Sequence, residues 1–135
     1  MSLCYLADFE AASKAAEQGL RVNPYSPDIY LDVLATVHFL RGNYQECLNH
    51  DAQIASGYPE SPAWRAACHG HLGNHAAAKR EAAAFVRAYR DVWAGDPKAG
   101  PADYVRWILD VNNPFARDED RERLAEGLRL AGLTT

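Results

Sequence analysis

The stretch from residue 28 to residue 59 constrains the fold most, because it has the pattern of two helices joined by a tight turn. Apolar residues first recur three and four positions apart, on one face of a helix. These residues are Ile29, Val33, Leu34, Val37 and Leu40. Gly42-Asn43 interrupts this pattern, a second apolar stripe runs from Tyr44 to Ala55, and Gly57-Tyr58-Pro59 ends it, since proline cannot continue a helix interior. Two such helices cannot bury their apolar faces alone, so the unit needs neighbouring helices.

The same signature occurs before and after this unit. Upstream, Phe9 and Pro24 precede Tyr44 and Pro59 by 35 residues each. Downstream, Leu72-Gly73-Asn74-His75 repeats the turn and opens a helical pattern that continues to about residue 93. The repeated spacing predicts a stack of helical hairpins.

Residues 101–132 depart from the repeat and predict two more helices, at about 101–110 and 118–131. Pro101 suits the first turn of a helix. Asp118, Glu119 and Asp120 lie in the first turn of the last helix, where the helix dipole favours negative charge, and Gly132 suits its end. Terminal elements that differ from the repeat usually cap a solenoid, so we expect these two helices to be caps.

Together these residues resemble the tetratricopeptide repeat (TPR) family. Gly42 and Tyr44 match the turn of that repeat, Leu34-Ala35 stand where the family has its Leu-Gly pair, and Pro59 closes the unit. The resemblance implies an all-α, TPR-like helix-turn-helix solenoid of about two and a half repeats in residues 3–93, with capping helices in residues 101–132. We interpret residues 1–135 as a single domain. Because the chain begins inside a helical pattern, we expect it to be a fragment of a longer protein.

The ending, residues 124–133, resembles the C-terminus of proteobacterial signalling proteins that carry a TPR-like region. This resemblance implies a non-enzymatic interaction module of a larger bacterial regulatory protein. By the TPR resemblance, a protein or peptide partner would bind in the groove of the first helices. The residues expected there are Asp32, Thr36, Phe39, Ala67 and His71. The alternative is a module for self-association, including a homodimer, or for packing within its own chain.

Charge and composition exclude several partners. The net charge is −4, and residues 1–60 alone carry −5, so no concentrated basic face is available for nucleic acid. No apolar run reaches the ~20 residues of a membrane span. Three cysteines without metal-ligand spacing suggest reduced thiols and a cytoplasmic location.

The residues also predict no catalytic site, no cofactor and no metal. His71 and His75 have the i, i+4 spacing of two metal ligands, and His69 is close in sequence, but the predicted turn between His71 and His75 would separate them. A histidine-based metal site therefore remains the less favoured alternative. Aromatic residues such as Phe85 and Trp107 occur at apolar helical spacing, which predicts packing in the core.

Overall fold

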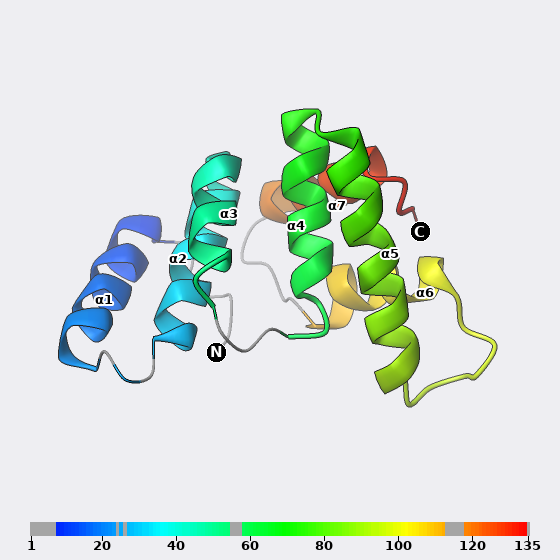
Figure 1. Ribbon diagram of the computed structural model, residues 1–135, viewed down its shortest axis with the longest axis horizontal. Helices are drawn as coiled ribbons and strands as arrows, with labels where there is room; N and C mark the ends of the chain where they lie inside the picture. Colours follow the sequence, from blue (N-terminus) through cyan, green and yellow to red (C-terminus); the bar gives the residue numbers. More distant parts are fainter. Residues whose placement is uncertain (1–7, 24, 26, 55–57, 113–117, 135) are drawn as a thin grey trace.

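The computed structural model describes residues 8–23, 25, 27–54, 58–112 and 118–134, and it is all-helical over these residues (Figure 1). The predicted fold class, all-α, is confirmed. The elements are α1 Phe9–Val22, α2 Asp28–Leu40, α3 Tyr44–Asp51, α4 Ser61–Leu72, α5 His75–Val92, α6 Pro101–Trp107, the π-helical turn η2 Ile108–Asn112, and α7 Asp118–Leu130. The expected helical tail near residues 3–6 lies outside the described residues.

Successive helices pack side by side along the first part of the chain. Helix α1 packs on α2, α2 on α3, α3 on α4, and α4 on α5 (Figure 1). The two hairpin turns have the same geometry. Gly42 and Gly73 both have a positive φ, and the following Asn43 and Asn74 donate their backbone N–H to the carbonyls of His38 and His69. Glycine is favoured at such left-handed positions, which explains why the Gly-Asn signature marks both turns.

The apolar stripe of α2 is buried as predicted, with one exception. Val33, Leu34, Val37 and Leu40 lie in the core, but Ile29 is 48% exposed. Helix α3 has 8 residues against 13 in α2, so the returning helix is too short to cover the first turn of α2. The five largest fully buried side chains come from α2, α5, η2 and α7, and they are Phe39, Phe85, Ile108, Leu124 and Leu128.

Two helix ends differ from the prediction. Helix α3 ends at Asp51 instead of running towards residue 55, because the next turn tightens: Gln53 and Ile54 bond three residues back, to the carbonyls of His50 and Asp51. The helix predicted at 101–110 is regular only to Trp107 and then widens into the π-helical turn.

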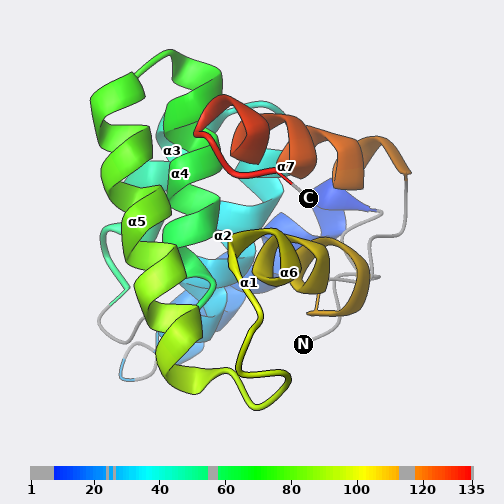
Figure 2. The same ribbon diagram turned by 90° about the vertical axis from the view of Figure 1, so that its right-hand side faces the viewer.

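Helix α7 lies across α4, although the two helices are far apart in the sequence (Figure 2). The approach is close because glycine stands on both helices. A Cβ added to Gly127 would lie 2.7 Å from Cβ of Ala67, and one added to Gly70 would lie 2.5 Å from the carbonyl oxygen of Gly127. The two helices can therefore meet only while these positions lack side chains.

Gly127→Ala should destabilise the protein by about 1–3 kcal/mol, because the added methyl group forces α7 away from α4. Urea unfolding followed by circular dichroism measures the change. Gly100→Ala is the matched control, since a Cβ at Gly100 meets nothing within 4 Å. Equal stability of the two variants would show that the close crossing is not needed.

Candidate functional site

The five predicted groove residues differ greatly in exposure. Phe39 and Ala67 are 0% exposed and Thr36 is 8% exposed, whereas Asp32 and His71 are partly exposed. The Thr36 hydroxyl donates to the backbone carbonyl of Asp32 at 2.8 Å. Of the five, only Asp32 and His71 thus offer surface to a partner in this arrangement.

Helix α7 occupies the surroundings of His71. The His71 Nε2–H donates to the backbone carbonyl of Arg123 at 2.8 Å, and the His71 ring stacks on Tyr44 with 4.3 Å between centroids. The Arg123 guanidinium donates to the Tyr44 hydroxyl at 3.0 Å. Phe39 packs edge-on against Tyr44 and Trp64. The face of the first helices around His71 is therefore covered by the chain's own last helix.

Asp32 lies instead in a group of acidic side chains. Burial, and then the negative charges of Glu60 and Asp51, raise the pKa of Asp32 to about 6. The nearby cation, Arg65, is held elsewhere: it pairs with Asp51 at 2.9 Å and with Glu81 at 3.0 Å. Among the described residues, neither Asp32 nor Glu60 forms an ion pair, so the two carboxylates make this surface locally negative.

A cavity of about 380 Å³ opens beside Glu60, between the start of α4, the end of α5 and α6. Its walls are mainly apolar and aromatic. They consist of Pro59, Glu60, Tyr89, Val92, Trp93, Ala94, Gly95 and Trp107. Trp107 and Val92 are 43% and 58% exposed, so the opening is accessible to solvent. The prediction that Trp107 packs in the core is wrong, whereas Phe85 is fully buried as predicted.

The aromatic rings of this cavity support one another. Trp93 meets Trp107 edge-to-face with 5.8 Å between centroids, and it packs on Tyr104 at 5.0 Å. The indole N–H of Trp93 is buried without a hydrogen-bond partner among the described residues, and it lies close to Gly95, where a Cβ would be 2.9 Å from it. A buried donor without an acceptor costs free energy, so this indole N–H lowers the stability of the wall.

Glu60 joins the cavity to the acidic group. Burial, and then the charge of Glu60, raise the pKa of Tyr89 to about 12. The charge of Glu60 also contributes to the raised pKa of Asp32. We call Asp32, Glu60, Tyr89, Trp93 and Trp107 the acidic–aromatic surface. Sequence reasoning found only Asp32 of these five. The aromatic residues at the end of α5 and in α6 recur with a helical period. That period does not show that they come together beside Glu60.

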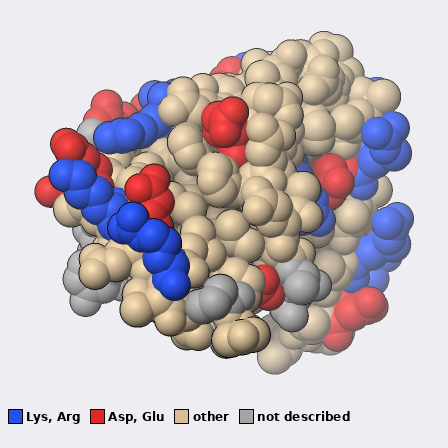
Figure 3. All heavy atoms as spheres, turned by 60° about the vertical axis from the view of Figure 1, so that its left-hand side comes forward, with Lys and Arg blue, Asp and Glu red and all other residues tan. Residues whose placement is uncertain are grey.

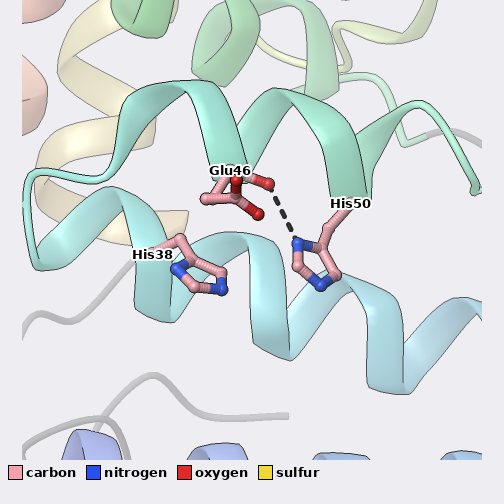
Figure 4. A group of neighbouring side chains, drawn as sticks. All are labelled: His38, Glu46 and His50. Carbon is pink, nitrogen blue, oxygen red and sulfur yellow. Dashed lines mark hydrogen bonds between the residues drawn. The ribbon is translucent and has the colours of Figure 1, made fainter.

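Among the described residues, His69, His71 and His75 do not come together as a group of three metal ligands. His71 bonds to α7, His69 lies 3.3 Å from the Asn74 amide, and His75 is exposed at the start of α5. Within the described parts of the chain, the group of three close metal-ligand side chains is a different one, formed by His38, Glu46 and His50 (Figure 4).

Cys47 and Cys68 are free and buried beside one another. A hydrogen bond that the Cys68 thiol donates to Cys47, followed by burial, raises the pKa of the Cys68 thiol. Raised pKa values keep thiols protonated and weakly nucleophilic. The pair therefore fits packing between α3 and α4 better than catalysis.

Charge on the surface is mixed. On the face in Figure 3, positive and negative side chains lie around a large uncharged area, and neither sign forms a continuous patch there. Within the described residues, each helix is too short or too polar to span a bilayer. No family model matches the chain, and neither the curated proteins nor the solved structures contain a match.

Asp32→Asn should stabilise the protein above pH 6 and change its stability little below about pH 4. The folded protein holds the Asp32 proton more tightly than the unfolded chain, because its pKa is raised to about 6. Protonation of Asp32 therefore favours folding at low pH, and this benefit is lost as the pH rises through about 6. We expect a gain of about 1–2 kcal/mol at neutral pH, after allowing for solvent screening.

Urea unfolding at about pH 4 and pH 7.5 measures this difference. Asp91→Asn, which changes an exposed carboxylate on α5, is the control. A gain of the same size at both pH values would mean that Asp32 is not a buried, titrating carboxylate.

Proposed function

We propose that the protein is a non-enzymatic, TPR-like interaction module that binds a cationic segment of a partner protein at the acidic–aromatic surface. The cavity beside Glu60 is the observation that carries this proposal. By the resemblances in its sequence, the module would belong to a larger bacterial regulatory protein in the cytoplasm. The free, buried thiols of Cys47 and Cys68 are in keeping with a reducing compartment.

The chemistry of the cavity favours a positively charged side chain. Cations bind the faces of Trp and Tyr rings, and a carboxylate beside those rings adds direct attraction. The lining supplies Trp93, Trp107 and Tyr89 together with Glu60, and none of its residues is a cation. A lysine or arginine side chain entering the cavity would therefore meet aromatic rings and the Glu60 carboxylate.

The position of α7 directs the partner to this surface. The groove of the first helices is covered around His71 by Arg123 and Gly127 of α7. A peptide lying there would have to displace the last helix. In our proposal, α7 therefore covers the groove of the first helices, and the partner binds in the cavity beside Glu60.

Peptide binding tests the proposal through the fluorescence of Trp93 and Trp107. Five-residue capped peptides that differ only in the central residue should differ in affinity. Peptides with arginine or trimethyllysine should bind most tightly, the lysine peptide less tightly, and the norleucine and glutamate peptides much more weakly. Binding should weaken at high salt, since exposed charges are screened. Glu60→Gln should weaken binding of the arginine peptide by about tenfold, which corresponds to roughly 1.4 kcal/mol.

Glu122→Gln is the matched control, because Glu122 is exposed on α7 and should leave the affinity unchanged. Trp107→Ala removes a partly exposed wall of the cavity and should also weaken binding. If the norleucine peptide bound as tightly as the arginine peptide, the ligand would be apolar and not cationic.

Self-association is a second candidate, favoured by a group of exposed apolar side chains where α1 meets α2. Val22, Tyr25 and Ile29 are 76%, 95% and 48% exposed. Exposed apolar groups of this kind can serve as an interface between two copies of a chain. Light scattering after size-exclusion chromatography should then show a dimer that Ile29→Asp converts to a monomer. A monomeric parent protein would exclude this candidate.

A further inference from the structure

Three metal-ligand side chains meet on the surface of the α2–α3 hairpin. His38 lies in the last turn of α2, while Glu46 and His50 lie four residues apart on α3. The tight turn at Gly42 brings the two helices together, and Figure 4 shows the imidazoles on either side of Glu46. One ligand atom from each residue lies within 4.8 Å of the other two.

We propose that His38, Glu46 and His50 bind a divalent transition-metal ion of the zinc type. This site is separate from the acidic–aromatic surface and does not depend on the proposed function. Two imidazoles and one carboxylate form a ligand set that zinc accepts in proteins, with a fourth position left for water or another ligand. Imidazole ligands also favour zinc, copper or nickel over magnesium and calcium, which prefer oxygen ligands.

The distances allow such coordination after small side-chain rotations. Ligand atoms around a tetrahedral zinc ion are roughly 3.3 Å apart, given metal–ligand distances of about 2.0–2.1 Å. The three ligand atoms lie within 4.8 Å of one another, and Glu46 is exposed while the two histidines are partly exposed. The His38 and His50 rings already lie 5.0 Å apart at an interplanar angle of 24°. Closing the site therefore requires the two stacked rings to turn about their side-chain bonds, so that one nitrogen of each faces the ion.

Hydrogen bonding prepares His50 for a metal. Its Nδ1 lies 2.9 Å from the backbone carbonyl of Glu46, an atom that can only accept. Nδ1 must therefore carry the proton, which leaves the lone pair of Nε2 free for coordination. Metal-ligating histidines usually donate their second ring N–H to a carbonyl or carboxylate in this way, which fixes the ring and the tautomer.

His38 has the complementary properties. Its imidazole stacks on that of His50 with 5.0 Å between ring centroids, and it must be neutral to bind a metal. The Asn43 amide lies 3.5 Å from Nδ1 of His38. Turning this amide over would present its oxygen to an Nδ1–H and free Nε2 for the metal. The Glu46 carboxylate would offset part of the charge of the ion.

Isothermal titration of the metal-free protein with Zn²⁺ at pH 7.5 tests the proposal. We expect one Zn²⁺ per chain and no binding of Mg²⁺. Because a metal that bridges α2 and α3 binds only the folded hairpin, saturating Zn²⁺ should raise the Tm by about 5 °C. Co²⁺ should give the visible absorption of a low-symmetry, four-coordinate site.

Glu46→Gln and His50→Gln should each weaken Zn²⁺ binding by at least tenfold. Glu46 is exposed, so its substitution should leave the fold intact, and circular dichroism of the metal-free variant verifies this. His75→Gln, which removes an exposed histidine on α5, should bind like the parent protein. Binding below one Zn²⁺ per chain, or equal loss in His75→Gln and His50→Gln, would overturn the proposal.

Discussion

The close packing of α7 on α4 is the constraint on which the rest of the molecule depends. Helix α4 presents small side chains, and Ala63, Ala66 and Ala67 are completely buried. Such residues let neighbouring helices approach until backbone meets backbone, as at Gly127. Dispersion attraction and the burial of apolar surface then stabilise the whole contact between α4 and α7. The same contact covers His71, so the architecture of the C-terminal end also decides which surfaces a partner can reach.

The local pattern of the sequence predicted most of the helices and both hairpin turns. Gly42 and Gly73 occupy left-handed turn positions, and the stripe from Val33 to Leu40 is buried. These features are local, since they depend on the backbone freedom of glycine and on a period of 3.6 residues. Boundaries were less predictable, because the short α3 and the widened turn after Trp107 depend on hydrogen bonds made at the helix ends.

The candidate sites could not be predicted in the same way. Periodicity shows that a face is apolar but not which helix covers it, so Trp107 was assigned to the core and Ala67 to a groove. His38 and Glu46 are separated by a turn, and only the packing of α2 on α3 makes them neighbours. Long-range contacts of this kind leave no repeated spacing in a single chain. The resemblance to TPR proteins supplied an expected groove, and it contained no information about α7.

Arg65 explains why the acidic–aromatic surface lacks a cation. Burial lowers the pKa of Arg65, but hydrogen bonds to Asp51 and Glu81 outweigh it and keep the pKa above the usual value. The guanidinium thus pairs with those two carboxylates and does not neutralise Asp32 or Glu60. The negative charges of Asp32 and Glu60 therefore repel one another. Burial first, and this repulsion second, raise the pKa of Asp32. A cation bound beside Glu60 would relieve the repulsion and favour ionised Asp32, so cation binding and release of the Asp32 proton must favour one another.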